Sequence, residues 1–306
     1  MKVAVTGATG FVGSRLVERL QSQGEQVLVF SRNVARAEKV FPPKAFPNVE
    51  IIAYTPTKTG DWQNAISGCE GVVNLAGEPI AESRWTPERK QSILSSRKLG
   101  TEKIVEAIKA ANSKPSVLVN ASAIGFYGTS ETATFDESSA AGNDFLAEVC
   151  QAWEAEARKV KESGTRLVIL RLGIVLGMGG ALAKMIPPFK LFAGGPIGSG
   201  SQWFSWIHRD DVVDLILQAL ENTQMEGIYN ATAPVPVRMK ELCDAMGRVM
   251  NRPSWLPVPG LALEALLGEG AKVVLEGQKV LPKRTKEAGF NYQYSQIESA
   301  LAEIIR

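Results

Sequence analysis

The sequence predicts an α/β protein built on a doubly wound parallel sheet, with a smaller lobe formed mainly by its C-terminal part. In the first two-thirds of the chain, short segments rich in Val, Ile and Leu alternate with helical segments, which is typical of parallel strands joined by helices. A glycine-rich segment lies directly between the first strand and the first helix. After about Gly177 this alternation ends and Gly and Pro residues become frequent. We assign this part of the chain mainly to the second lobe.

Each strand is predicted from a short apolar run and each helix from apolar residues at helical spacing. Thr86 followed by Pro87 provides a helix N-cap with proline at the first helical position, and Gly24 ends the first helix. The predicted strands span residues 2–6, 26–31, 49–54, 71–75, 116–121 and 166–172. The predicted helices span residues 11–23, 34–40, 61–67, 86–111, 143–162, 211–220, 239–250 and 261–276.

These elements divide the chain into two predicted units. Residues 1–176 together with about 207–232 form the nucleotide-binding domain, and about 177–206 together with 233–306 form the smaller substrate or lid lobe. In a doubly wound protein such a lobe closes over the carboxyl ends of the strands, where ligands bind.

The composition is that of an ordinary globular chain of 306 residues. With 34 Lys and Arg against 32 Asp and Glu, the net charge of +2 provides no broad basic field, so we expect no nucleic-acid partner. Three cysteines without a Cys-x-x-Cys pair, and a single histidine, favour a reducing compartment and predict no metal site. No apolar run reaches the roughly 20 residues of a membrane span, so we expect a cytoplasmic protein without a membrane contact.

The segment TGATGFVG follows the first strand at once and begins the first helix. Gly7 allows a tight turn, Gly10 lets the backbone approach a pyrophosphate, and Gly13 lets helix and strand pack closely. With a strand before it and a helix after it, the segment favours a Rossmann-like dinucleotide site over a simple turn. The residues expected to bind the cofactor here are Gly7, Thr9, Gly10, Phe11, Val12 and Gly13.

The end of the second predicted strand indicates which dinucleotide binds. An NAD-binding chain carries an acidic residue about 20 residues after the loop, where it binds the ribose 2′-hydroxyl. Ser31 and Arg32 stand here instead and can donate hydrogen bonds to a 2′-phosphate, which favours NADP(H) over NAD(H). The alternative is that Arg32 is only a solvated surface residue. Residues at neighbouring strand ends complete the predicted cofactor site: Leu75, Ala76, Gly77 and Ala121.

Longer stretches of the sequence resemble the extended short-chain dehydrogenase/reductase superfamily, which includes nucleotide-sugar epimerases and dehydratases. LAGEPIAESRW, SRKLGT, ASAIGFYG, DFLAEVCQAWEAEA and RLGIVLG are similar to its atypical "epimerase family protein" branch, which has its own short C-terminal domain. The resemblance implies NADP(H) binding. Some cyanobacterial and plastid members are named as cell-division inhibitors or giant-chloroplast proteins, which adds a division-related partner and the plastid stroma to the expectations. Because many relatives pair through the long helices beside the sheet, a homodimer is also expected.

Typical members of this superfamily carry a Ser or Thr after the fifth strand and a Tyr-x-x-x-Lys pair on the next helix. The lysine lowers the tyrosine pKa from about 10, so that the phenol can pass a proton near neutral pH. Ser122 fits the first position, but the predicted helix 143–162 contains no tyrosine. Its best positional equivalents are Cys150 and Glu154, and a glutamate raises the pKa of a neighbouring acid. The usual proton relay is therefore absent from the sequence.

Two side chains are candidates to replace the missing proton donor. Cys150 carries a thiol, although the apolar residues at helical spacing around it indicate a buried position. Tyr127 lies five residues past Ser122 and is the other candidate, unless it only shapes the pocket. A bound water is the third source of the proton.

Five further residues are expected to line the substrate pocket. Glu78 and Arg84 follow the fourth predicted strand, with simple pairing between these two side chains as the alternative. Trp203 and Trp206 lie where similar enzymes bind the distal half of a nucleotide-sugar and can stack on a base or a sugar, and Lys190 is the nearby cation for a phosphate.

The sequence thus predicts an NADP(H)-dependent oxidoreductase or epimerase-like enzyme that acts on a small carbonyl or hydroxyl compound, sugar derivatives included. Ser122 would hold the substrate oxygen, while hydride transfer belongs to the cofactor. The alternative is a catalytically weak or inactive NADPH-binding regulatory protein linked to cell or plastid division. Turnover of the cofactor distinguishes the two.

Overall fold

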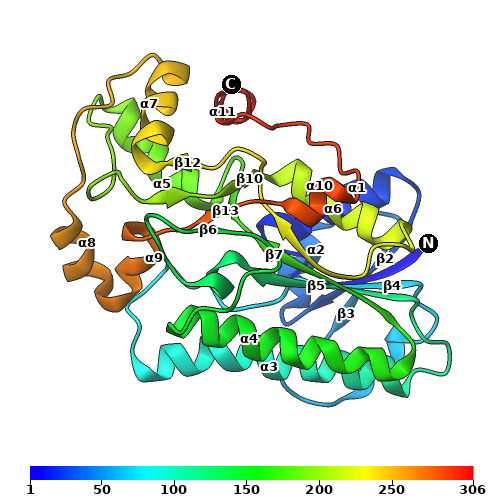
Figure 1. Cartoon of the computed structure of the whole chain (residues 1–306). Coiled ribbons are helices and arrows are strands. Elements are labelled where there is room, and N and C mark those ends of the chain that lie inside the picture. Colours follow the sequence, from blue (N-terminus) through cyan, green and yellow to red (C-terminus); the bar gives the residue numbers. More distant parts are fainter. Residues whose placement is uncertain (306) are drawn as a thin grey trace.

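The computed structural model describes residues 1–305, and its largest feature is a seven-stranded sheet with the strand order β11-β7-β5-β4-β1-β2-β3 (Figure 1). All of its strand pairs are parallel, and the order reverses beside β1. The strands are β1 (Lys2–Thr6), β2 (Gln26–Ser31), β3 (Val49–Ala53), β4 (Gly71–Asn74), β5 (Val117–Ala123), β7 (Arg166–Leu172) and β11 (Gly227–Ala231). This sheet confirms the predicted Rossmann-like α/β fold.

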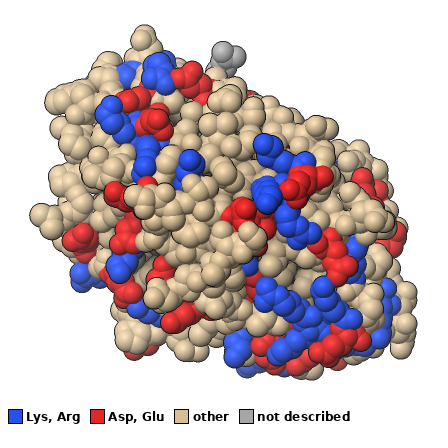
Figure 2. Space-filling view, viewed as in Figure 1, with Lys and Arg blue, Asp and Glu red and all other residues tan. Residues whose placement is uncertain are grey.

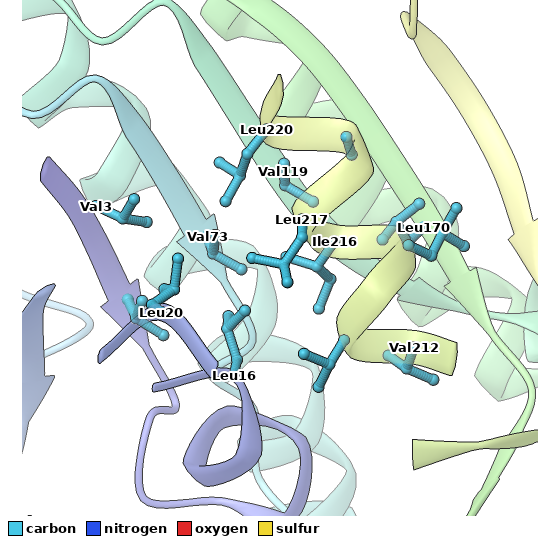
Figure 3. Packing of buried hydrophobic residues seen from close by; sticks show 14 of the residues in the cluster. Val3, Leu16, Leu20, Val73, Val119, Leu170, Val212, Ile216, Leu217 and Leu220 are labelled. Atoms are coloured by element: carbon cyan, nitrogen blue, oxygen red, sulfur yellow. The ribbon is translucent and has the colours of Figure 1, made fainter. Parts of the chain in front are cut away.

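Successive residues of the strands point to opposite faces of the sheet, and helices cover each face. In β1, Val3 and Val5 pack into one hydrophobic cluster, and Ala4 packs into the other. Figure 3 shows the first cluster, where Leu16 and Ile216 of two neighbouring helices meet the strands. The helices on this face are α1 (Phe11–Ser22), α2 (Val34–Val40) and α6 (Arg209–Glu221). The opposite face is covered by α3 (Pro87–Ala110), α4 (Phe145–Arg158) and the 3₁₀ segments η1 (Asp61–Ile66) and η3 (Lys159–Ser163).

Four of these helices, α2, α3, α4 and α6, begin at side-chain caps. The Thr86 hydroxyl accepts a hydrogen bond from a backbone N–H of α3, as the sequence predicts, and Asp144 does the same for α4. The cap of α6 is the single histidine, His208, whose Nδ1 accepts from the Asp210 N–H. His208 therefore caps the start of α6, and its Nε2 lies 2.9 Å from a carboxylate oxygen of Glu303.

A third hydrophobic cluster forms the core of the second lobe. Figure 1 shows α5, α7 and α11 of this lobe above the sheet. Short strands connect its elements: β8 (Ile174–Leu176) with β10 (Trp206–His208), β9 (Trp203–Phe204) with β12 (Val237–Arg238), and β6 (Thr134–Phe135) with β13 (Lys279–Val280). Further elements are η2 (Ile124–Tyr127), α5 (Gly180–Lys190), α7 (Met239–Met250), α8 (Gly260–Leu267), η4 (Gly268–Ala271), α9 (Lys272–Leu275), α10 (Lys283–Glu287) and α11 (Ile297–Ile305).

Three segments differ from the elements that the sequence predicts. The sequence predicts no strand or helix at 227–231, which is the seventh strand of the sheet, β11. The helix predicted at 261–276 breaks at Gly268, whose φ of +59° ends α8. The Pro187-Pro188 pair lies inside the last turn of α5 instead of in a loop. Phe189 beside it is buried in the core of the lobe, so packing outweighs the hydrogen bonds that the prolines cannot make.

The surface carries no single sign of charge on the face shown in Figure 2, where Lys and Arg side chains are interspersed with Asp and Glu. This distribution agrees with the net charge of +2. None of the helices within residues 1–305 is long and apolar enough to cross a membrane.

Candidate functional site

The glycine-rich loop between β1 and α1 brings bare backbone to the helix N-terminus. Gly7 has a φ of +68°, and a Cβ atom there would lie 2.7 Å from the backbone carbonyl carbon of Leu75. A Cβ atom on Gly13 would collide with the carbonyl oxygen of Gly7. Gly10 is the N-cap of α1, so no side chain there competes for the first N–H groups of the helix. The loop therefore offers backbone donors and the positive end of the helix dipole to an anion.

Arg32 at the end of β2 faces Glu78, which follows β4. Nη1 of Arg32 donates to Oε1 of Glu78 at 2.7 Å, and Arg89 donates to the other carboxylate oxygen at 3.4 Å. The hydrogen bond from Arg32 is the main reason that the pKa of Glu78 lies below its usual value. The Arg32 side chain is 68% exposed, so it can reach a ligand. Arg84 is not the ion-pair partner of Glu78, which corrects the alternative drawn from the sequence.

The remaining predicted cofactor residues differ in how far a ligand can reach them. The Ser31 hydroxyl is buried and donates to the carbonyl oxygen of Asn33, so it must turn to meet a phosphate. Ala121 is buried within β5. The Phe11 ring packs against the segment that begins at Gly177, where a Cβ atom would lie 2.9 Å from the ring. Leu75, Ala76 and Gly77 continue from β4 beside the loop, and Thr9 and Val12 lie within or next to it.

Buried polar side chains link the ends of β1 and β4 to the middle of β5. Thr6 donates to Oδ1 of Asn74 at 2.6 Å, and Nδ2 of Asn74 donates to Asn120 at 2.7 Å and to Thr101 at 2.9 Å. These bonds fix the strand ends from which the cofactor loops leave. The sequence alone does not predict this network, although β4 and β5 both carry a Val-Asn pair at the same register.

An ion pair is buried between α4 and β7, next to the end of β5. Nε and Nη2 of Arg171 donate to the two carboxylate oxygens of Glu154 at 2.8 and 2.9 Å. Ser122 donates to the same carboxylate at 2.8 Å, and Arg158 reaches it from the surface at 2.9 Å. The predicted candidate Ser122 is therefore 1% exposed and already uses its proton.

Tyr127 belongs to the same network. Its hydroxyl donates to Oδ1 of Asn230 at 2.7 Å and accepts from Nη1 of Arg171 at 2.9 Å. Burial raises the pKa of the Tyr127 phenol, and the opposing effect of Arg171 does not cancel it. A general acid works best with a pKa near the working pH, so this phenol is a weaker proton donor than a free tyrosine.

Cys150 adjoins the network from one turn earlier on α4. Its Sγ lies 3.6 Å from the carbonyl oxygen of Ala123, and the side chain is 4% exposed. Burial, followed by the neighbouring Glu154 carboxylate, raises the pKa of the Cys150 thiol to about 11. The structure thus brings Ser122, Tyr127 and Cys150 close to one another, but holds all three in the interior.

Both tryptophans predicted to line the pocket are occupied by other contacts. Trp206 is 0% exposed in the core of the second lobe, which corrects its assignment to a substrate pocket, because no ligand can reach a fully buried ring. The Trp203 ring lies beneath Arg238 at 3.7 Å and near Lys279 at 4.9 Å. Lys190 is exposed at the end of α5.

The segment after β4 meets the C-terminal part of the chain at the start of α3. Lys90 pairs with Glu269 of η4 at 2.5 Å, and a Cβ atom on Gly270 would lie 3.1 Å from the Trp85 ring nitrogen. Arg84 lies against Gly268, where a Cβ atom would be 3.3 Å from its Nε. The loop that carries the predicted residues Glu78 and Arg84 is therefore partly covered by η4.

Two arginines of this region were missed in our sequence analysis. Arg171 interrupts the apolar run RLVILRL of β7, and a charge inside such a run indicates a buried ion pair. Arg97 of α3 donates from Nη1 to the carbonyl oxygen of Glu78 at 3.0 Å, at the edge of the cofactor loop.

Comparisons with known proteins agree with the fold and with the cofactor loop. The NAD dependent epimerase/dehydratase family matches residues 3–232, and a domain of unknown function, DUF1731, matches residues 258–304. The Arabidopsis thaliana protein named epimerase family protein SDR39U1 homolog, chloroplastic, is 53% identical over 309 residues, which cover 100% of this chain and 87% of that protein. Epimerase family protein YfhF of Bacillus subtilis is 40% identical over 306 residues, with 100% and 98% coverage.

Solved structures extend the comparison. The crystal structure of human epimerase family protein SDR39U1 (isoform 2) with NADPH has a TM-score of 0.88 and 35% sequence identity, and covers 99% of each chain. A UDP-glucuronic acid 4-epimerase from Bacillus cereus has a TM-score of 0.81, covers 99% of this chain and 97% of that chain, and shares only the fold at 18% identity. The chain therefore belongs to the NAD dependent epimerase/dehydratase family and is similar along its whole length to the epimerase family proteins of the SDR39U1 type.

Proposed function

We propose that this protein binds NADP(H) and acts as an oxidoreductase or epimerase-like enzyme on a small carbonyl or hydroxyl compound. The observation that carries the proposal is the bare backbone of the glycine loop at the N-terminus of α1, where a Cβ atom on Gly7 or Gly13 has no room. The presence of NADPH in the similar human structure supports the choice of cofactor.

Residues at the ends of β1, β2 and β4 are placed to hold the parts of NADP(H). The backbone of the loop and the first turn of α1 would hold the pyrophosphate, and the exposed Arg32 would bind the 2′-phosphate in exchange for Glu78. Leu75, Ala76 and Gly77 would lie beside the dinucleotide at the end of β4. The bound nicotinamide ring would supply the hydride donor or acceptor.

We propose further that water, rather than Tyr127 or Cys150, supplies the proton. Both side chains are buried and have a raised pKa, and the Tyr127 hydroxyl already has two partners. Ser122 gives its proton to Glu154 and would meet a substrate only as an acceptor. The elements of residues 177–206 and 233–306 would serve as the substrate or lid lobe over this edge.

A second candidate function is favoured by the same burial. A protein whose two side-chain candidates for the proton donor, Tyr127 and Cys150, are enclosed would bind NADPH tightly without turning it over if water does not replace them, and would pass the state of the cofactor to a partner. That partner would be a division-related protein or a second copy of the chain. The name of the Arabidopsis relative supports the plastid stroma as its location, and the cytoplasm is the alternative.

Titration calorimetry with NADPH and NADH, followed by a panel of carbonyl compounds, tests the proposal. Absorbance of the reduced nicotinamide band reports oxidation of the bound cofactor. Binding of NADPH with oxidation by any compound of the panel supports the enzyme. Binding without oxidation over the whole panel supports the regulatory protein, and a chain that binds neither nucleotide contradicts both.

A further inference from the structure

Four large apolar side chains lie exposed where the segment after α5 runs beside the segment after α7, at one end of the molecule (Figure 1). Leu191 and Phe192 follow α5 and are 77% and 57% exposed, and Trp255 and Leu256 are 67% and 42% exposed. The N–H groups of Trp255 and Leu256 both donate to the carbonyl oxygen of Gly194, so the two segments lie side by side. Single exposed apolar residues are ordinary, whereas these four, on adjoining segments, form an apolar patch of the kind that binds partners.

The backbone at Phe192 adopts a strained conformation next to a well-packed core. Its φ of +60° lies in the left-handed region, which bulky residues rarely adopt. Its N–H donates to the carbonyl oxygen of Phe189 at 3.0 Å, and the Phe189 ring is buried in the core of the second lobe. A Cβ atom on Gly194 would lie 2.4 Å from that ring, so close packing holds the turn between them. Strain of this kind persists only where the surroundings impose it, and it is concentrated at binding sites.

A cation without an acidic partner lies against the apolar patch. The guanidinium carbon of Arg252 is 4.4 Å from the centre of the Phe192 ring, and its Nη1 donates to the carbonyl oxygen of Asn251 at 2.9 Å. Among residues 1–305, no carboxylate forms a salt bridge with Arg252 or with the exposed Lys190 at the end of α5. An arginine beside an aromatic ring keeps its charge and can still donate to a carboxylate. The patch therefore combines apolar contact area with unpaired positive charge.

Arg252 also lines an open depression of about 510 Å³ at the end of α7. The other two charged side chains that line it in the described chain are already paired. Asp244 accepts from Lys240 at 3.3 Å, and Arg248 pairs with Glu298. The depression therefore has room for a side chain next to one unpaired positive charge.

Charge complementarity selects the occupant of this surface. An unpaired guanidinium among apolar and aromatic side chains complements a segment that carries carboxylates between apolar side chains. A two-fold contact between two copies of the chain through the patch would bring two copies of Arg252 together, which disfavours it. The carboxylates of Asp244 and Glu298 beside the depression disfavour an anionic lipid surface.

We propose that the apolar patch, together with Arg252, binds an acidic segment of a partner protein. Apolar side chains of this segment pack on Phe192 and Trp255, and one of its carboxylates pairs with Arg252. The inference does not depend on the proposed binding of NADP(H), because these residues belong to the second lobe and lie outside the glycine loop. It assigns to this lobe an interaction surface of its own.

Peptide display tests the proposal without a known partner. We would select random 12-residue peptides displayed on phage against the immobilised wild-type protein, and measure the affinity of the selected, fluorescein-labelled peptides by fluorescence anisotropy. The selected sequences should carry Asp or Glu between apolar residues. Their affinity should fall at least about tenfold in Arg252→Glu and in Phe192→Gly, because each variant removes one part of the surface.

Phe192→Gly separates binding from folding. Glycine adopts a φ of +60° without strain, so this variant should keep the fold while it loses the ring, and urea unfolding checks this. The matched control is Leu261→Ser on α8, which removes an apolar side chain that is 80% exposed and lies outside the patch. Its affinity for the selected peptides should stay within about twofold of the wild type.

Three results would overturn the proposal. The first is no enrichment of peptides, or enrichment of basic ones. The second is equal affinity of the selected peptides for the wild type, Arg252→Glu and folded Phe192→Gly. The third is that Phe192→Gly abolishes a dimer of the wild type in sedimentation, or its binding to vesicles of phosphatidylglycerol and phosphatidylcholine, because the patch would then be occupied by a second copy or by lipid.

Discussion

The carboxylate of Glu154 on α4 is held by the guanidinium of Arg171 on β7 through two hydrogen bonds of 2.8 and 2.9 Å, with both side chains buried. Glu154 is also one of the two positions at which the sequence predicts a replaced catalytic pair. The same two side chains engage Ser122 and Tyr127. The polar groups next to the end of β5 therefore form an internal network, which explains why no free proton donor stands there.

Removal of one partner of this pair should destabilise the protein strongly. In Arg171→Met the charge of Glu154 stays buried without its main partner, and we expect the free energy of unfolding to fall by about 3–5 kcal/mol. The double variant Arg171→Met with Glu154→Leu removes both charges and should recover much of that loss. Urea unfolding measures both. The matched control is Lys161→Ala, which breaks the exposed pair with Glu226 and should change little. If Arg171→Met is as stable as this control, the ion pair between Arg171 and Glu154 is not a buried pair that stabilises the fold.

The variant Tyr127→Phe tests whether the Tyr127 hydroxyl only stabilises the fold or also donates the proton in the reaction. The variant loses the hydrogen bonds to Asn230 and Arg171, so the free energy of unfolding should fall by about 1–3 kcal/mol. If water supplies the proton, oxidation of NADPH by an active carbonyl compound should continue at a similar rate in the folded variant. Loss of oxidation without loss of stability would show that Tyr127 is the acid.

Sequence pattern predicts the sheet well because parallel strands buried on both faces are apolar runs. The boundaries of β1, β2 and β7 are those expected, and the glycine loop lies where its spacing puts it. Trp206 shows the limit of such reasoning. From the sequence, an aromatic ring at this position is equally consistent with stacking on a ligand and with packing in a core. The elements around Trp206 bury the ring completely and show that it packs in a core.

The polar interior could not be predicted for a related reason. The partner of Arg171 is 17 residues away in the chain and that of Tyr127 is 103 residues away. No local periodicity encodes such pairs. Arg97 likewise appears as an ordinary polar residue of a long helix until Gly77 and Trp153 are placed around it.

The buried thiols should make the protein less stable in alkaline solution. Burial raises the pKa of Cys69 and Cys150 to about 11 and that of Cys243 to about 12. Thiols of the unfolded chain ionise near pH 8.5, so the unfolded state loses its protons first as the pH rises. The free energy of unfolding should therefore fall from about pH 8.5 to 10, by up to about 2 kcal/mol for each thiol. Urea unfolding of Cys150→Ala should show a shallower decline than the wild type, and an equal decline would contradict the burial of this thiol.

A methyl group in the cofactor loop should block the nucleotide. In Gly13→Ala the new Cβ atom meets the carbonyl oxygen of Gly7, so the loop must shift and NADPH should bind at least about tenfold more weakly. Gly100→Ala in α3 is the matched control, because nothing lies within 4 Å of its Cβ atom. That variant should keep its affinity and gain up to about 1 kcal/mol of stability. Equal NADPH affinity of both variants, measured by calorimetry, would exclude the loop as the binding site.

The most direct measurement is the affinity of the wild-type protein and of Arg32→Ala for NADPH and for NADH. The wild type should bind NADPH at least about tenfold more tightly than NADH, because Arg32 can make charge-assisted hydrogen bonds to the 2′-phosphate. Arg32→Ala should lose most of this preference, whereas Arg248→Ala, which removes an exposed arginine of α7, should keep it. Equal affinity of the wild-type protein for the two nucleotides would contradict the account.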